Sequence, residues 1–420
     1  MDIKRIWRKC IPPVILLVFG LVGGAILDRQ VLALFLFQDK VVPADMLDYQ
    51  LIGEAWDKIR KHYVDQKAVK SKALTYGAIS GMVDALGDTG HSNFLTPEML
   101  KQQNDFAQGQ FKGIGAQVQM KGGQVVIVAP LDNSPAQKAG LRPADVIMKV
   151  DGQDITGLPL EQVVRRISGT PGTSVTLTIF TPQTGHTRSV KLVRASIVVH
   201  NATWQVLPGT AVGHLRLSAF SHNVTKDLKQ ILMDMKAKKL KGIILDLRNN
   251  PGGLLEEAIG VSSQFLSEGI VLKEKNARGE INSEAVLPGG LAPNIPMVAL
   301  INSGTASAAE IVAGALHDAH RATLIGEVTF GTGTVLTDFV LSDGSALLLA
   351  VEEWLTPNGS TIWHKGITPD IIVSLPPDVL PLSPETERGM AASQLQASKD
   401  EQLLRALDLL AQPAARSSLQ

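Results

Sequence analysis

The sequence is poor in cysteine, has no excess of charge of either sign, and contains no internal repeat or low-complexity tract. Cys10 is the only cysteine, which excludes an internal disulfide, a thiolate metal cluster and a cysteine nucleophile within a folded domain. Because 40 Lys and Arg balance 40 Asp and Glu, nothing indicates nucleic acid as a partner. We also expect no cofactor and no metal site. With 420 residues, 45% of them hydrophobic, the chain should form two or three domains with real cores.

The clearest targeting signal lies at the N-terminus. Basic residues at positions 4–9 precede an apolar run at residues 11–27, which is marginal for a membrane-spanning helix of about 20 residues. A cleavable signal peptide is the alternative, since residues 23–25 are small. The basic residues place the N-terminus in the cytoplasm and the following chain outside. We therefore expect a membrane anchor or signal segment at residues 1–35, with the folded domains periplasmic or extracellular, either anchored or secreted.

Two helices are predicted before the first β-rich segment, within a helical N-terminal segment at residues 36–105. The apolar positions of residues 47–63 fall on one helical face, and a second helix is expected at residues 73–86. A turn cluster at residues 87–90 ends that helix, and His91 follows it. No acidic partner for His91 is identifiable nearby, so a structural role is favoured over a catalytic one.

A small β-rich module is predicted at residues 106–198. Strands are expected at residues 117–120, 125–129 and 174–180, and a helix at residues 160–167. The module contains, in this order, Gly113-Ile114-Gly115-Ala116, Ala139-Gly140-Leu141 and Asp145-Val146-Ile147.

The order of these motifs resembles a PDZ domain. The resemblance implies that Gly113, Ile114, Gly115 and Ala116 offer backbone N–H groups to the C-terminal carboxylate of a peptide. The peptide would add as a strand between the sheet edge and the helix. A small β-domain without a ligand is the alternative.

From residue 213 the pattern changes to alternating strands and helices. The predicted strands are residues 212–217, 242–247, 297–301, 323–325 and 346–351, all in one sheet, with helices at residues 224–236 and 254–266. Pro251-Gly252-Gly253 follows a strand, where adjacent glycines let backbone amides point into a site. A tight turn and an anion-binding loop remain equal alternatives there. After Ile372 the chain becomes rich in proline and ends with an amphipathic helix that includes Leu403 and Leu407.

Ser307 is the candidate nucleophile. It lies in Ile301-Asn-Ser-Gly-Thr-Ala-Ser-Ala-Ala-Glu-Ile311, a small-residue turn between a predicted strand and a predicted helix. The start of a helix has unpaired N–H groups and a dipole that favours negative charge, which suits a nucleophilic hydroxyl and an oxyanion. The alternative is that Ser303, Thr305 and Ser307 are only cap and turn residues.

Together the motifs resemble those of the C-terminal processing peptidases, also called tail-specific serine proteases, over most of residues 47–372. The motifs that carry the resemblance are the PDZ-like module, Leu86-Gly87-Asp88-x-x-His91-Ser92, His214-Leu215-Arg216-Leu217-Ser218-x-Phe220, residues 246–253, residues 302–310, Gly326-Glu327-x-x-Phe330-Gly331, residues 341–346, Thr356-Pro357-Asn358-Gly359 and residues 365–370. The fold implied is α/β, with a crotonase-like spiral peptidase core at residues 199–376, the inserted PDZ domain, and a Pro-rich linker and C-terminal helix at residues 377–420.

The resemblance also assigns roles in the site. It implies that Ser307 is the nucleophile and that the N–H groups of Ala308 and Gly253 form the oxyanion hole. The family's general base is a lysine in Phe-Gly-Lys-Gly-x-Val-Gln, and the glutamine orients it. This chain has Thr332 at the lysine position and Leu336 at the glutamine position. It also has Ser168 where the family commonly has the arginine of Ile-Arg-Gly.

The missing base leaves two functions open. A serine hydroxyl is a poor nucleophile without a proton acceptor, and loss of the base costs on the order of 10⁶ in kcat. Lys365, His91 and His214 are the replacement candidates. The first function is a serine peptidase that recognises protein substrates or unfolded C-termini through its PDZ domain. The second is a catalytically inactive binding or regulatory protein, and a homo-oligomer is left open in both cases.

Overall fold

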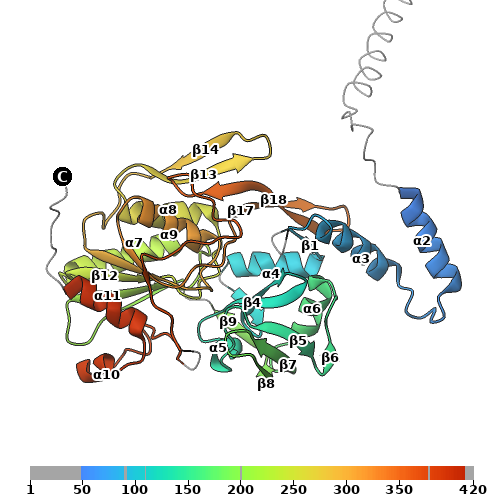
Figure 1. Ribbon diagram of the computed structural model, residues 1–420, viewed down its shortest axis with the longest axis horizontal. Coiled ribbons are helices and arrows are strands. Elements are labelled where there is room, and N and C mark those ends of the chain that lie inside the picture. Colours follow the sequence, from blue (N-terminus) through green and yellow to red (C-terminus); the bar gives the residue numbers. More distant parts are fainter. Residues whose placement is uncertain (1–48, 89–91, 109, 199–200, 377–378, 412–420) are drawn as a thin grey trace, which may run out of the picture. The chain divides into compact units, whose positions relative to one another are not determined.

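The computed structural model describes residues 49–88, 92–108, 110–198, 201–376 and 379–411 (Figure 1). The chain divides into two compact units, with the boundary after Ser71. The predicted anchor or signal segment and Cys10 lie outside the described residues. Among the residues that are described, no helix is both long enough and apolar enough to cross a membrane.

The first unit contains helix α2 (Tyr49–His62), which agrees with the helix predicted over residues 47–63. None of the residues of α2 is buried, and Leu51 on its apolar face is 62% exposed. Helix α3 (Ser71–Asp84) follows, where a helix was expected at residues 73–86, and all of it except Ser71 belongs to the second unit.

The PDZ-like module forms a sheet with strand order β3-β4-β5-β7-β8, and β6 pairs with β5. Its core is made by alternate residues of the strands, such as Val175, Leu177 and Ile179 of β7, which fits the period of a strand with one buried face. The elements are β3 (Ala116–Lys121), β4 (Gln124–Pro130), α5 (Pro135–Lys138), β5 (Val146–Val150), β6 (Gln153–Asp154), α6 (Leu160–Ile167), β7 (Ser174–Thr181) and β8 (His186–Val193). A two-stranded sheet of β2 (Gln110–Gly113) and β9 (Ala195–Val198) lies where the chain enters and leaves the module.

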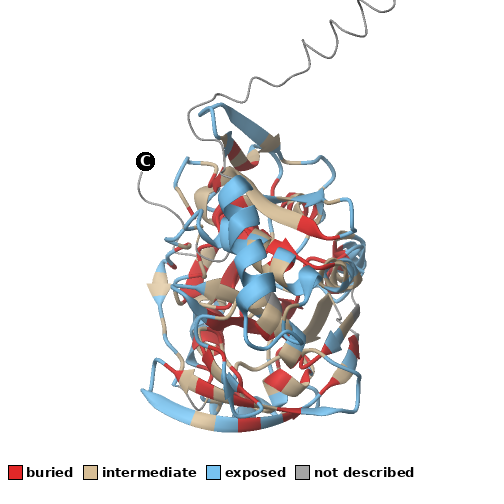
Figure 2. Cartoon of the chain, turned by 90° about the vertical axis from the view of Figure 1, so that its right-hand side faces the viewer, coloured by how far each residue is buried: buried red, intermediate tan, exposed pale blue. Residues whose placement is uncertain are grey.

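The central sheet has the order β10-β11-β12-β15-β16-β19, parallel except for the antiparallel edge strand β10. All residues of β11, β12 and β15 are buried, as expected for parallel strands covered on both faces. Figure 2 shows the chain with buried residues in red and exposed residues in pale blue. The strands are β10 (Ala202–Val206), β11 (Val212–Leu217), β12 (Gly242–Asp246), β15 (Met297–Ile301), β16 (Thr323–Gly326) and β19 (Ile371–Ile372).

Helices cover both faces of this sheet, and successive residues of a strand face opposite sides. Ile243 and Leu245 of β12 pack with α7 (Val224–Ala237), α8 (Leu255–Phe265) and α9 (Ala308–Asp318), whereas Ile244 faces the other side. That side is covered by α11 (Glu401–Ala411), the amphipathic helix predicted from the leucine spacing, through Leu403 and Leu407. A short helix, α10 (Ala392–Gln396), precedes it.

A second sheet corrects one prediction. The strand expected at residues 346–351 was assigned to the central sheet, but β18 (Ala346–Leu355) belongs to a separate antiparallel sheet. Its neighbours are β1 (Asn93–Leu95), β13 (Ile270–Asn276), β14 (Ile281–Ala285), through β13, and β17 (Thr334–Val340). Most residues of β18 are only half-buried, which fits an antiparallel sheet that is not covered on both faces.

Buried ion pairs join three segments that are distant in sequence. Arg216 of β11 donates to Asp132 of the PDZ-like module at 2.6 and 2.8 Å, and its guanidinium lies 3.4 Å from Asp246 of β12. Asp246 also accepts from Arg248 at 2.7 Å, and Arg248 donates to Asp400 next to α11 at 2.9 Å. A buried charge is tolerated only when it is paired, so the PDZ-like module, the central sheet and the C-terminal segment are held together by one cluster.

His214 of β11 belongs to the same cluster. It is fully buried, with Nδ1 2.7 Å from Glu387 and Nε2 3.1 Å from Asp246. Burial by itself lowers the pKa of His214, but the hydrogen bonds to Asp246 and Glu387 outweigh this effect and raise it to about 9. The imidazolium therefore carries a structural charge at neutral pH.

The raised pKa of His214 predicts a specific pH dependence of stability. The contribution is complete below pH 6.5, the ordinary pKa of histidine, and is lost as the pH rises through about 9. The free energy of unfolding should fall by about 3 kcal/mol over that window, because one pKa unit corresponds to about 1.4 kcal/mol. Chemical denaturation of the wild type and of His214→Gln at several pH values measures it. An identical pH slope in both proteins would contradict the assignment.

Candidate functional site

The turn that carries Ser307 connects β15 to α9 and is fixed by side chains on both sides. Asn302 Oδ1 accepts the N–H of Asn249 at 2.8 Å and that of Gly304 at 3.1 Å. Thr305 Oγ1 donates to the carbonyl of Leu247 at 2.8 Å. Thr305 is thus a turn residue, which agrees for this position with the alternative interpretation given for the sequence of the turn. These bonds join the Ser307 turn to the loop after β12, where the two glycines lie.

Ser307 adopts a backbone conformation that is unusual for a residue with a side chain. Its φ is 54° and its ψ is −123°, so it is strained and must be held by its surroundings. Gly252 packs against it so closely that a Cβ on Gly252 would lie 2.6 Å from the Cβ of Ser307. The side chain of Ser307 is half-buried.

The backbone N–H groups of Gly253 and Ala308, the two predicted oxyanion donors, differ from that of Gly252 in having no acceptor within the described parts of the chain. The N–H of Gly252 donates to Asn250 Oδ1 at 2.9 Å and is therefore committed. Ala308 is the first residue of α9, and no acceptor for its N–H or for that of Gly253 is found within the described parts of the chain. Gly253 has a φ of 145°, and a Cβ there would collide with the carbonyl of Phe220. Gly253 and Ala308 remain the candidate donors.

Glu310 is the site residue whose role sequence reasoning missed. Its buried carboxylate accepts four hydrogen bonds: Oε2 from the N–H groups of Ser307 and Thr332, both at 2.9 Å, and Oε1 from Thr329 Oγ1 and the N–H of Gly331. Burial raises the pKa of Glu310, and the four donors oppose that shift. The spacing Ser307-x-x-Glu310, a helix N-terminal signature, was the signal that could have revealed it.

The same bonds place Thr332 beside Ser307. Because both backbone N–H groups bind one oxygen atom, their nitrogens lie within about twice a hydrogen-bond length of each other. Thr332 is buried, and a threonine hydroxyl cannot take a proton near neutral pH. Glu310 is no substitute base, since its two oxygens have about four lone-pair positions and four donors already use them.

The replacement bases considered from the sequence fare differently. His214 is wrong as a base, because both ring nitrogens are held by buried carboxylates in the ion-pair cluster. Lys365 has an exposed side chain, although its loop packs against the Thr332 loop through the hydrogen bond of His364 N–H to Gly331 O at 2.9 Å. His91 lies outside the described residues. Leu336, at the position of the orienting glutamine, is on β17 and 36% exposed.

The PDZ-like module contacts both loops of this site. Pro143 packs so closely on Gly304, within the Ser307 turn, that a Cβ at Gly304 would lie 2.6 Å from it. Lys121 Nζ lies 4.6 Å from the ring centroid of Phe330, two residues before Thr332. The module is therefore in contact with the Ser307 turn and with the Thr332 loop.

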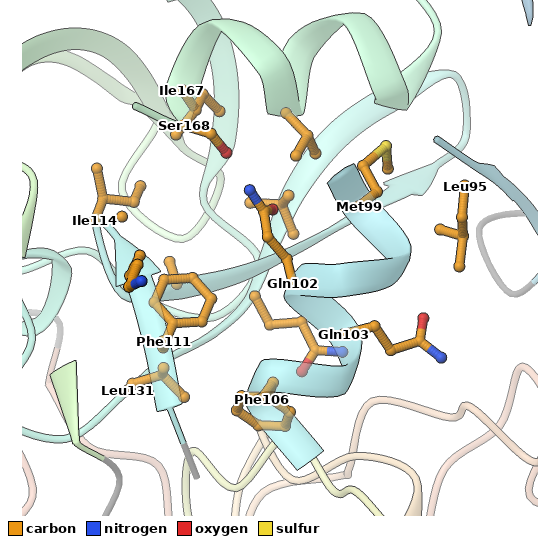
Figure 3. A pocket seen from close by; sticks show the side chains of 16 residues that line it. Leu95, Met99, Gln102, Gln103, Phe106, Phe111, Ile114, Leu131, Ile167 and Ser168 are labelled. Carbon is orange, nitrogen blue, oxygen red and sulfur yellow. The ribbon is translucent and has the colours of Figure 1, made fainter. Parts of the chain in front are cut away.

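A cavity of about 230 Å³ lies along the edge of the module (Figure 3). Gly113, Ile114 and Ala116 of the glycine-rich segment line it, together with Ile167 and Ser168 at the end of α6. Gly115 does not line the cavity, because it is turned toward Ser134, where a Cβ would collide. The segment expected to bind a peptide carboxylate thus borders a groove that is lined mostly by apolar residues.

Comparisons with known proteins agree with this architecture. The profile of Peptidase family S41 matches residues 211–373 and that of the PDZ domain matches residues 126–179. The chain is 38% identical over 334 residues to a carboxy-terminal-processing protease of Bartonella bacilliformis, covering 77% of this chain and 74% of the relative. It is 37% identical to the carboxy-terminal processing protease CtpA of Bacillus subtilis, covering 78% of this chain and 69% of the relative.

A solved structure, the photosystem II D1 C-terminal processing protease, is 30% identical with a TM-score of 0.67. The match covers 83% of this chain and 99% of that protein. These findings confirm the predicted α/β peptidase fold with a PDZ domain.

The role of Glu310 can be tested by Glu310→Gln. Glutamine has one acceptor oxygen, so two of the four donors lose their partner, and the free energy of unfolding should fall by about 1–3 kcal/mol. Glu257→Gln is the matched control, because Glu257 also accepts several hydrogen bonds, from Asn223 and Thr225, but away from Ser307. Equal and small losses in the two variants, measured by chemical denaturation, would show that Glu310 does not hold the two loops together.

Proposed function

Since the chain belongs to peptidase family S41, the family of the C-terminal processing proteases, we propose that it is a serine peptidase of this type that works outside the cytoplasmic membrane. Its PDZ domain captures the free C-termini of protein substrates, and Ser307 cleaves a peptide bond of the captured chain. The observation that carries the proposal is the strained Ser307, held beside two backbone amides without an acceptor among the described residues. The basic and apolar N-terminal segment supports the address.

In the proposed reaction, Ser307 Oγ attacks the carbonyl carbon, and the N–H groups of Gly253 and Ala308 stabilise the oxyanion. The amine leaves with a proton from water, and water then hydrolyses the ester on Ser307. The family's lysine is replaced by Thr332, so the hydroxyl proton passes to solvent. Loss of the base leaves roughly 10³–10⁴ of rate enhancement over water in serine proteases. We therefore propose a slow peptidase.

A second candidate function rests on the replaced positions. Thr332, Leu336 and Ser168 occupy three positions at which the family commonly has lysine, glutamine and arginine. Loss of several members of one catalytic arrangement favours a protein that binds C-termini, or regulates an active relative, without cleaving them. In this function the groove beside Gly113 and Ile114 would be the working site.

Binding in the groove should require a free carboxylate. Loss of a charge-assisted hydrogen bond costs about 1.5–3 kcal/mol, so amidating the C-terminus of a peptide should weaken its binding at least tenfold. Fluorescence anisotropy with full-length Ser307→Ala protein measures affinity without turnover. Acetylation of the peptide's N-terminus is the control and should change little. Equal affinity for acid and amide forms would overturn the assignment of the groove.

Restoring the base should separate the two functions. Thr332→Lys with Leu336→Gln should raise peptidase activity on an unfolded protein by several orders of magnitude, because Ser307 gains an oriented proton acceptor. Wild-type cleavage should be slow and should disappear in Ser307→Ala. If wild type and Ser307→Ala are equally inert, the binding function is the correct one. A folded double variant without activity would contradict the proposal that only the base is missing.

A further inference from the structure

One wall of the peptide groove comes from outside the PDZ module. Helix α4 (Pro97–Ala107) precedes the module in the chain, yet Met99, Gln102 and Phe106 on it line the same cavity as Ile114 and Ile167 (Figure 3). A groove built from the PDZ sheet and α6 alone would be open on this side. The described structure therefore encloses the groove with a helix from another segment.

Helix α4 is attached to the peptidase core at both ends. The strand β1 just before it pairs with β18, and Thr96 caps its first turn by accepting the N–H of Met99 at 3.3 Å. At its other end, the carbonyl of Ala107 accepts the N–H of His222, which lies between β11 and α7, at 2.9 Å. A ligand in the groove would thus contact the PDZ module on one side and a core-anchored helix on the other.

Two glutamines of α4 line the cavity, and Gln103 donates to Asp338 at 3.4 Å. Gln102 is therefore the polar side chain of this helix that remains available to the groove. Its side chain extends from α4 toward Ser168 and Ile114, at the end of the cavity where the glycine-rich segment lies (Figure 3). No hydrogen bond of the Gln102 carboxamide is found within the described residues, and most of the residues that line the cavity with it are apolar. A half-buried amide without a protein partner in such a groove is suited to bind a polar group of a ligand.

We propose that the carboxamide N–H of Gln102 donates a hydrogen bond to the C-terminal carboxylate of the bound polypeptide. This inference rests on the proposed PDZ function and adds a side-chain contact from outside the module. The ligand class is a polypeptide with a free C-terminus and an apolar last side chain, since Ile114, Val164 and Ile167 surround the remaining space.

Gln102→Glu tests the contact, because it replaces the donor by a carboxylate that repels the ligand's own. In full-length protein that also carries Ser307→Ala, the affinity for a free-acid peptide with a C-terminal apolar residue should fall at least tenfold. The affinity for the amidated peptide should fall much less. Gln102→Lys should keep or increase the affinity for the acid form. Asn104→Asp is the control, since it adds the same charge to the same helix at an exposed position outside the cavity.

The outcomes separate the inference from the function on which it rests. If the Ser307→Ala protein prefers the acid form but Gln102→Glu weakens acid and amide peptides equally, the groove function stands and the role of Gln102 is wrong. The same holds if Gln102→Glu and Asn104→Asp act alike. If acid and amide peptides bind equally before any change at position 102, both proposals fall. Circular dichroism of each variant establishes that it is folded.

Discussion

The arrangement of the site depends on the hydrogen bonds that the buried carboxylate of Glu310 accepts. One of its oxygens holds the backbone of Ser307 and of Thr332, and the other holds the Thr329–Gly331 part of the same loop. This carboxylate therefore holds the Ser307 turn and the Thr332 loop together through backbone N–H groups, so the arrangement does not depend on the side chain of residue 332. The strained backbone of Ser307 can persist because the hydrogen bond to Glu310 and the packing of Gly252 hold it in place.

The ion-pair cluster around Asp246 also supports the site, because it lies next to the loop that follows β12. Asp246 ends β12, and Arg248 follows it shortly before the loop with Gly252 and Gly253. Arg216 connects Asp246 to Asp132 of the PDZ domain. Leu131, the neighbour of Asp132, lines the cavity beside Gly113. This cavity, the loop with Gly252 and Gly253 and the C-terminal segment are thus connected through one cluster of charges, most of them buried, and a buried charge is tolerated only when it is paired.

Much of the fold followed from local pattern, whereas the polar contacts of the site did not. The apolar runs of β11, β12 and β15 are strong local signals, and each of these strands was predicted close to its observed bounds. The leucine spacing predicted the presence of α11 without giving its bounds. The strands β13, β14 and β17 were missed because they carry many polar residues and lie in a partly exposed sheet. His214 was predicted only as a candidate replacement base, because its partner Glu387 lies 173 residues further along the chain. Contacts of that separation leave no local signal, and neither does the attachment of α4 to the groove.

The central claim is that Ser307 is presented with oxyanion donors but without a titrating base. The rate at which a fluorophosphonate labels Ser307, measured between pH 5 and 9 and localised by peptide mapping, tests it most directly, because a general base reveals its pKa in such a profile. Without a base the logarithm of the rate should rise linearly with pH and reach no plateau. A plateau with an apparent pKa in this range would show that a side chain takes the proton from Ser307 and would contradict the claim.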